Sequence, residues 1–335
     1  MYIGTPRQLL HLVFDTGSGD FWVWSWLMPS PLLVGRDAYY NASASSSSSL
    51  MDGQSWGVSY GSSEAFGVVW SDTVIMDAGN QFFGVVGNPV ECAQGVDTFF
   101  QDFTGIDGIM GLSNAFNDSE RPTPQESWTA YVLPNFPCKI CPCDSITKRR
   151  ELMGSASLFT ISLVQGGVGT IDFGYINASQ YSGSIAYTPV TIIPGTTGGF
   201  WAFEWTGFAI GSHPFNSTNT QILTDTGSFI SLLPQSIADK YYAQVRGAYT
   251  QSDGSYLFPC SAKLPSFTFG VGSARIVIPG NYMLYAPVGD GICYGAVQPT
   301  TEDSYAYFSI PMFDALFVVH DYGGMQMGFA QRTFA

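Results

Sequence analysis

Two short segments of the chain combine an apolar run with an aspartate, a threonine, a glycine and a serine. The first, Leu12–Ser18, reads LVFDTGS, and the second, Ile222–Ser228, reads ILTDTGS. A single Asp-Thr-Gly is equally well explained as a turn, because Asp and Gly are ordinary turn residues. Two copies, each preceded by a strand-like run, predict instead that strands deliver Asp15 and Asp225 into one active site, where each glycine permits a tight turn whose N–H groups face the carboxylate.

Two adjacent carboxyl groups can divide the work of hydrolysis between them. Because like charges at close range resist joint ionisation, one group keeps a proton while the other acts as a base. The base takes a proton from a water held between them, and the protonated group donates to the carbonyl oxygen under attack. Such a reaction needs neither a metal nor a covalent intermediate. The three histidines are scattered, and no Ser or Cys has the motif context of a catalytic triad.

The composition limits the partners of the protein. Twelve Lys and Arg residues against 26 Asp and Glu residues leave a formal charge of −14, which repels a phosphate backbone and argues against nucleic-acid binding. This charge suits an acidic working environment, although an acidic protein that is merely soluble fits it equally well. No apolar run approaches the roughly 20 residues needed to span a bilayer.

The pattern of the chain predicts an all-β fold with few helices. Short alternating runs, separated by Gly, Ser, Asn and Pro, are typical of many short strands. The best helix candidate is Pro234–Arg246, with a proline near its start and apolar residues spaced by four. The clearest strand regions are Gly57–Val74, Gly169–Phe173, Ser184–Ile193 and Phe200–Ile210. The repeated Asp-Thr-Gly-Ser motif indicates a duplicated fold in which each copy anchors one lobe, and its spacing is far too long for a solenoid.

Cysteines and glycosylation motifs favour the secretory pathway. The chain has six cysteines and four Asn-x-Ser/Thr motifs, which predict a secreted protein or one in a vacuolar lumen. No signal peptide precedes Tyr2, so we expect the start to be truncated, with the signal peptide and any pro-segment missing. The four motifs begin at Asn41, Asn117, Asn177 and Asn216.

Several further segments resemble the pepsin-like aspartic peptidases. Tyr2–Pro6 is similar to the start of the strand that leads to the first Asp-Thr-Gly of that family, and Val58–Ser62 to the tip of its flap, the hairpin that closes over the substrate. Ile106–Leu112 resembles the family's Asp-Gly-Ile-Leu-Gly-Leu segment. The resemblance covers nearly the whole chain. It implies a bilobal acid protease fold, with two related β-barrel-like lobes at residues 1–165 and 166–335 around a central cleft.

The resemblance also assigns roles to residues. It implies a monomer that hydrolyses polypeptides bound in extended form, without a cofactor or a metal. Asp15 and Asp225 would be catalytic, and Ser18 and Ser228 would hydrogen-bond their outer oxygens. The other implied roles belong to Thr16 and Thr226 as braces between the two loops, Gly17 and Gly227 in the loops, Tyr60, Gly61 and Ser62 in the flap, Trp22 beneath Tyr60, Phe100 and Ile109 in the pocket for the side chain before the cut, and Cys260 and Cys293 as a disulfide. For Phe100 and Ile109, core packing is an equally good explanation.

Two regions depart from the family pattern. Pro311 is interpreted as replacing a glycine behind the second catalytic loop, and Met312 as replacing a nearby acidic residue. The segment Pro134–Glu151 holds Cys138, Cys141 and Cys143; it favours disulfides over zinc, one of them to Cys92, or a gene-model error. The alternative function is a catalytically silent relative that binds peptides, glycans or another enzyme through the cleft.

Overall fold

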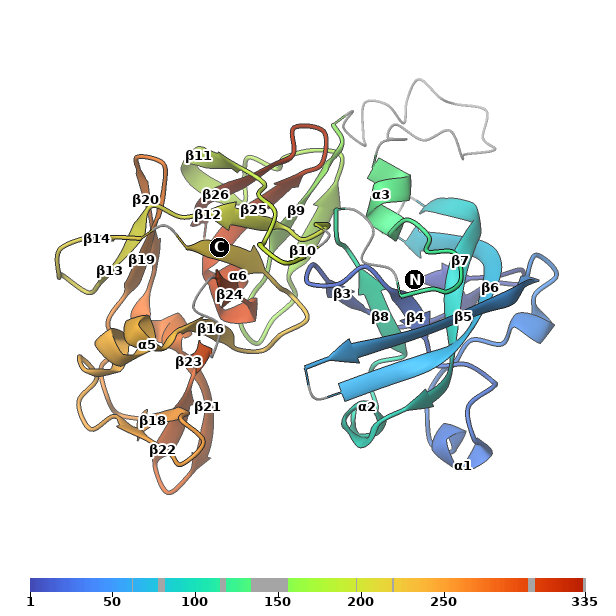
Figure 1. The fold of residues 1–335 in the computed structure, drawn as a ribbon, viewed down its shortest axis with the longest axis horizontal. Helices are drawn as coiled ribbons and strands as arrows, with labels where there is room; N and C mark the ends of the chain where they lie inside the picture. Colours follow the sequence, from blue (N-terminus) through green and yellow to red (C-terminus); the bar gives the residue numbers. More distant parts are fainter. Residues whose placement is uncertain are drawn as a thin grey trace. The chain divides into compact units, whose positions relative to one another are not determined.

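The structure is a computed structural model that describes residues 1–61, 63–77, 82–114, 119–133, 156–196, 198–218, 220–300 and 305–333. It is mostly β, as predicted, and divides into two compact units, Met1–Arg149 and Arg150–Ala335 (Figure 1). Ser62, Asn117 and the cysteine-rich part of Pro134–Glu151 lie outside the described residues.

The first unit is built on one eight-stranded sheet in the order β2-β1-β6-β7-β4-β8-β3, with β5 paired to β6. Its helices are short. The elements are β1 (Tyr2–Ile3), β2 (Gln8–Leu9), β3 (Val13–Asp15), β4 (Phe21–Val23), α1 (Ser30–Leu33), η1 (Ala42–Ala44), β5 (Ser49–Tyr60), β6 (Ser63–Asp77), β7 (Phe82–Val96), α2 (Thr98–Asp102), β8 (Gly108–Gly111) and α3 (Trp128–Val132).

A long hairpin forms where the sequence predicts strand structure over Gly57–Val74. Burial alternates along β6, with Ala65, Val69 and Val74 inside and Glu64 and Phe66 exposed. This period of two is the pattern of a strand with one face on a core. The hairpin pairs Tyr60 with Ser63, so its tip lies at the predicted flap.

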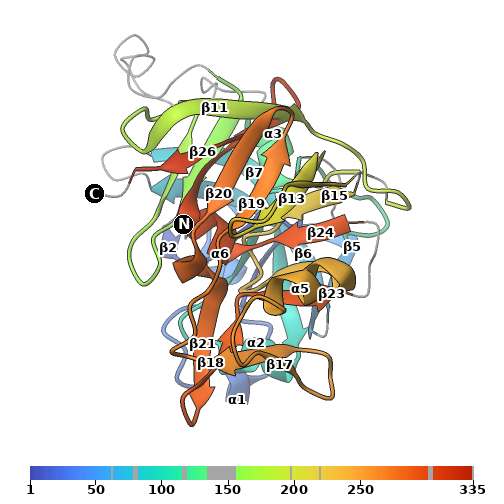
Figure 2. The same cartoon turned by 90° about the vertical axis from the view of Figure 1, so that its left-hand side faces the viewer.

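The described residues of the second unit form four sheets. Their orders are β10-β9-β25-β26-β11, β12-β15-β24-β16-β23, β14-β13-β19-β20 and β17-β18-β22-β21. The elements are β9 (Leu158–Ser162), β10 (Thr170–Phe173), β11 (Tyr181–Pro189), β12 (Ala202–Glu204), β13 (Gly207–Ile210), β14 (Asn216–Ser217), β15 (Gln221–Thr224), β16 (Ser231–Pro234), α5 (Gln235–Tyr242), β17 (Tyr249–Thr250), β18 (Tyr256–Pro259), β19 (Phe267–Val271), β20 (Ala274–Ile278), η3 (Gly280–Met283), β21 (Leu284–Gly289), β22 (Ile292–Gly295), β23 (Val297–Thr300), β24 (Tyr305–Phe308), α6 (Ile310–Ala315), β25 (Leu316–Asp321) and β26 (Gln326–Arg332). Figure 2 shows α5 lying beside β23.

Two boundaries differ from the expected ones. The sequence placed residues 158–162 in the first lobe. In the structure these residues form β9, which pairs with β25 of the second unit, because this pairing satisfies the backbone N–H and C=O groups of the strand. The predicted helix at 234–246 begins at Gln235 and ends at Tyr242, and the chain then tightens through bonds from Gln244 to Tyr241 and from Val245 to Tyr242.

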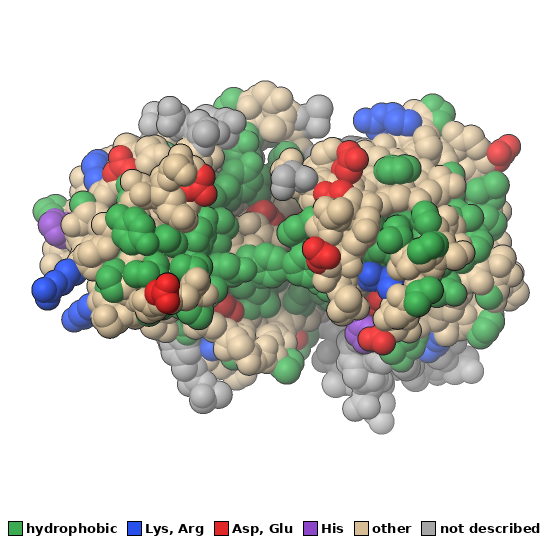
Figure 3. All heavy atoms as spheres, turned by 90° about the horizontal axis from the view of Figure 1, so that it is seen from below, with side chains coloured by type: hydrophobic (Ala, Val, Ile, Leu, Met, Phe, Trp, Pro, Cys, Tyr) green, Lys and Arg blue, Asp and Glu red, His purple; other side chains and the backbone are tan. Residues whose placement is uncertain are grey.

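The described cysteines settle one expected pairing and overturn another. Cys260 and Cys293 form a disulfide, which confirms that prediction. Cys92 carries a free thiol that is fully buried on β7, so the suggested disulfide to Cys92 is wrong. The surface in Figure 3 is covered mainly by apolar and uncharged side chains, with charged groups scattered among them, as the composition indicates. No described helix is both long enough and apolar enough to cross a membrane.

Candidate active site

The first Asp-Thr-Gly loop leaves the end of β3 and holds its carboxylate by two local hydrogen bonds. Asp15 is only 4% exposed. The Gly17 N–H donates to Asp15 Oδ1 at 2.8 Å, and Ser18 Oγ donates to Asp15 Oδ2 at 2.5 Å. Because both oxygens accept a bond, the loop fixes the orientation of the carboxylate.

Strand β8 supports this loop from behind. Asp15 lies opposite Gly111 in the parallel β3–β8 pair. The Leu112 N–H donates to the Asp15 carbonyl at 2.6 Å, and the Ser113 N–H donates to the Ser18 carbonyl at 3.0 Å. A Cβ atom at Gly111 would lie 2.4 Å from the carbonyl carbon of Gly19, so only glycine allows this close approach.

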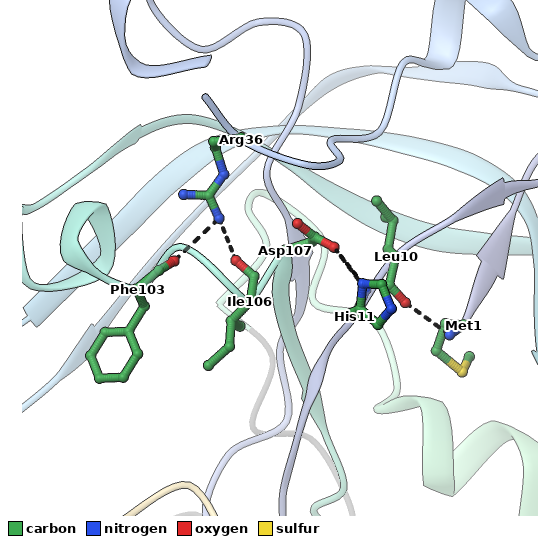
Figure 4. A network of polar contacts seen from close by, with 7 residues as sticks. All are labelled: Met1, Leu10, His11, Arg36, Phe103, Ile106 and Asp107. Atoms are coloured by element: carbon green, nitrogen blue, oxygen red, sulfur yellow. Dashed lines mark hydrogen bonds and ion pairs between the residues drawn. The ribbon is translucent and has the colours of Figure 1, made fainter. Parts of the chain in front are cut away.

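A polar network anchors the segments that lead into β3 and β8 (Figure 4). The buried Asp107 carboxylate accepts the His11 N–H at 2.8 Å and lies 3.4 Å from His11 Nδ1. The Arg36 guanidinium donates to the carbonyls of Phe103 and Ile106. Burial lowers the pKa of Arg36, and the negative charge of Asp107 opposes that shift. The network thus joins two segments that are distant in sequence directly before the Asp15 loop.

The second Asp-Thr-Gly loop, at the end of β15, repeats the arrangement of the first. The Gly227 N–H donates to Asp225 Oδ1 at 2.8 Å, the same bond and length as in the first loop. The Asp225 N–H donates to the Phe308 carbonyl at 2.8 Å, and the Ile310 N–H donates to the Ser228 carbonyl at 3.3 Å. One detail differs, because Ser228 Oγ donates to the Ile230 carbonyl at 3.1 Å. Its expected bond to Asp225 stays a prediction.

The strand register revises the interpretation of Pro311. Thr224 lies opposite Phe308 in β15–β24, as Phe14 lies opposite Met110 in β3–β8. The residue that takes the place of Gly111 is therefore Ser309, two positions before the proline. Pro311 itself lies in the first turn of α6, where a backbone N–H has no helical acceptor to lose.

The predicted flap and pocket residues of the first unit meet in one hydrophobic cluster. Trp22 Nε1 donates to Tyr60 Oη at 3.1 Å. The Trp22 ring packs edge-on against Phe100, with centroids 5.0 Å apart, and stacks on Trp56 at 6.0 Å. Ile109 belongs to the same cluster. Trp22 therefore lies against Tyr60, as expected, while contact of Phe100 and Ile109 with a substrate stays a prediction.

The remaining predicted residues occupy the turns. Gly61 has a φ of +58°, which the hairpin tip requires and glycine adopts without strain. Thr16 and Thr226 are buried in their own loops, and their bracing role between the loops stays a prediction.

Sequence reasoning missed a pair of buried acids next to this cluster. Asp20 and Glu91 are each 2% exposed; burial raises the pKa of the Asp20 carboxyl, and the neighbouring Glu91 side chain acts in the opposite direction. Burial raises the pKa of Tyr60 well above its ordinary value, and Asp20, Asp15 and Glu91 raise it further. The signal in the sequence was an acid directly before the apolar strand Phe21–Val23, where a charge is costly unless it is paired.

Comparison with known proteins defines the class of the protein. The family model described as eukaryotic aspartyl protease matches residues 1–332. Endothiapepsin from Cryphonectria parasitica is 38% identical over 321 residues, which make up 95% of this chain and 70% of that protein. Penicillopepsin-3 from Penicillium janthinellum is 35% identical, over 96% of this chain and 75% of that protein. The chain therefore belongs to the eukaryotic aspartyl protease family, and the prediction of an aspartic peptidase is confirmed.

A solved structure supports the fold independently. The aspartic proteinase from Irpex lacteus matches with a TM-score of 0.74, covering 99% of this chain and 93% of that chain. At 19% identity this likeness concerns the fold alone. The predicted pepsin-like fold class is thereby confirmed.

Proposed function

We propose that this protein is an aspartic endopeptidase whose catalytic groups are Asp15 and Asp225. One observation carries the proposal: in both units the glycine two residues after the aspartate donates its N–H to Oδ1 at 2.8 Å. Equivalent loops on equivalent parallel strand pairs suit two carboxyl groups that work together. Family membership supports the same reaction class.

The proposed mechanism uses one proton shared between the two carboxyl groups. One carboxylate removes a proton from a water molecule, and the resulting hydroxide attacks the scissile carbonyl carbon. The protonated carboxyl group donates to the carbonyl oxygen, giving a neutral tetrahedral intermediate. The first carboxyl group then gives its new proton to the leaving nitrogen while the second carboxylate accepts a proton from a hydroxyl of the intermediate. The C–N bond breaks, the two products leave and the pair is singly protonated again. Because like charges resist joint ionisation, the singly protonated pair persists over a useful range of pH.

The proposed substrate is a polypeptide in extended conformation, bound by a monomer. Residues 60 and 61 at the hairpin tip would close over it and contribute backbone hydrogen bonds, as an added strand does. We also propose a secreted or vacuolar location. The exposed side chain of Asn216 and the half-buried one of Asn177, each in a glycosylation motif, support this location.

Isosteric replacement of each aspartate tests the mechanism. Asp15→Asn and Asp225→Asn should each lower kcat by about 10²–10⁴-fold on a denatured protein substrate, because neither amide can serve as the base. Asp52→Asn, an exposed position on β5, is the control for a lost carboxylate. Full activity in either active-site variant would refute the mechanism. A wild-type chain that binds peptides without cutting them would favour a silent binding protein.

A further inference from the structure

We infer that Asp20 and Glu91 are positioning residues that share one proton and thereby hold the flap strand in its binding geometry. This inference rests on the proposed function, since it concerns the flap of that same site. Neither residue contacts the Asp15 carboxylate through any hydrogen bond given above. Their effect on the reaction would pass through Trp22, Tyr60 and Ser119.

The chemistry of the pair requires a proton. Trp22 lies opposite Glu91 in the parallel β4–β7 pair, which brings the Glu91 side chain to Asp20 at the start of β4. Two neighbouring carboxyl groups resist joint ionisation, and they can form a hydrogen bond with each other only while one of them is protonated. Both groups are almost completely buried, where a second negative charge would be strongly disfavoured.

The surroundings of the pair favour the protonated form. Asp20, Asp15 and Glu91 all raise the pKa of Tyr60, and Glu91 and Asp72 raise the pKa of Cys92, so the titratable groups that interact electrostatically with the pair are themselves acids. Burial raises the pKa of Asp20, while hydrogen bonds from Ser119 and the neighbouring Glu91 side chain oppose that shift. A charge of −1 on the pair is thus the stable state in acid.

Two routes connect the pair to the flap. In the first, Trp22, the strand partner of Glu91, donates its indole N–H to Tyr60 at the flap tip. In the second, the Ser119 N–H donates to Asp20 Oδ1 at 2.7 Å, and Ser119 Oγ accepts the Gly57 N–H of β5 at 3.3 Å.

The second route continues along the flap strand. Next to Ser119, Ser55 and Arg121 exchange backbone bonds of 2.9 and 2.7 Å. The segment 119–121 is therefore a clamp between Asp20 and β5. When both carboxyl groups ionise, their repulsion should loosen this clamp, so that KM for the peptide rises with pH.

Single amide substitutions separate charge from packing. Asp20→Asn and Glu91→Gln each supply a permanent donor and keep the pair at −1, the charge of the proton-sharing state. Asp72→Asn is the control, because Asp72 is also fully buried but accepts hydrogen bonds from Tyr40, Ser47 and Thr73 instead of another acid. The measurements are kcat, KM and Tm of the full chain from pH 3 to pH 7.

The expected result is specific to KM and to pH. Both amide variants should match the wild type within about twofold at pH 3–4, and at pH 6–7 their KM should be about 3–10-fold lower, with kcat little changed. Because the folded-state pKa of Asp20 is raised, the stability it contributes is complete in acid and is lost as pH rises through that pKa. The fall in Tm between pH 4 and pH 7 should therefore be smaller in both variants than in the wild type. Asp72→Asn should lower Tm at every pH.

Other outcomes would overturn the inference. A Tm that falls with pH as steeply in both variants as in the wild type would exclude proton sharing. A flatter Tm profile with an unchanged KM profile would exclude the positioning role. If the wild type cleaves no peptide at any pH, the proposed function fails, and the Tm profiles still test the carboxyl pair by themselves.

Discussion

At the scale of single residues, His320 is the least expected side chain of the core. It is fully buried on β25 and stacks on Phe159, with ring centroids 4.4 Å apart and planes 4° from parallel. Phe313 lies parallel to it at 6.2 Å, and Trp201 meets its edge. Among the residues that the structure describes, neither ring nitrogen has a hydrogen-bond partner. The imidazole therefore occupies a site suited to a neutral aromatic ring.

Because the site suits a neutral ring, the folded protein loses stability at low pH. Burial lowers the pKa of His320 to about 3, from an ordinary value of 6.5. The unfolded chain binds the proton first as pH falls, so stability is lost between about pH 6.5 and pH 3. His320→Phe should remove this loss and gain about 3 kcal/mol of unfolding free energy at pH 4 relative to its effect at pH 7. Chemical denaturation at the two pH values measures the difference, with the exposed His213→Phe as control. An equal effect at both pH values would contradict the prediction.

At the scale of secondary structure, the β5–β6 hairpin is the element that the proposed mechanism moves. Its tip carries Tyr60, whose ring packs edge-on against Phe100 at 5.7 Å and whose hydroxyl accepts the Trp22 N–H. These contacts fix the tip against the hydrophobic cluster. The rest of the hairpin is held by strand pairing within the sheet.

Tyr60→Ala should therefore impair turnover more than stability. Loss of the ring leaves the tip unable to close in register over a peptide, and misplacement of this kind lowers kcat/KM by about 10²-fold. Tyr60→Phe removes only the bond from Trp22, so a smaller decrease is expected. Leu50→Ala, an exposed position on β5, controls for a shortened side chain in the same strand. Peptide kinetics and thermal unfolding are the measurements; unchanged kinetics in Tyr60→Ala would make this residue an ordinary strand aromatic.

At the scale of the whole molecule, the two units have separate sheets, and the disulfide between described cysteines lies in the second unit. The disulfide Cys260–Cys293 closes a loop in the second unit alone and joins the regions of β18 and β22, which are also paired as strands. A covalent link of this kind stabilises mainly by restricting the unfolded chain.

Removing that link should destabilise the second unit selectively. Replacing Cys260 and Cys293 together by Ala should cost about 2–4 kcal/mol of unfolding free energy. Limited proteolysis at rising temperature, with the fragments mapped by mass, should show earlier cleavage within residues 150–335 than in the wild type and unchanged cleavage within 1–133. Earlier cleavage in both regions would show that the two units unfold together.

Much of this protein could be predicted from short stretches of sequence. The Asp-Thr-Gly-Ser loops, the alternating strand of the hairpin and the helix after Pro234 each depend on neighbours a few residues apart, and the physics of turns and periodicity acts over that range. Asp15 and Asp225 were singled out for this reason, whereas Tyr60 was assigned to the flap by family resemblance. The pairing of Cys260 with Cys293 came from family resemblance and not from spacing.

Tertiary structure decided the features that depend on distant partners. Glu91 meets Asp20 only because β7 lies beside β4, and Ser309 takes the place matching Gly111 only through the register of β24 on β15. In the sequence, His320 looks like an ordinary polar residue. Only the structure shows that it is stacked between Phe159 and Phe313. A local sequence pattern predicts which face of an element is apolar. The order and packing of the sheets decide which neighbour lies on that face, and therefore the protonation state and packing of each buried group.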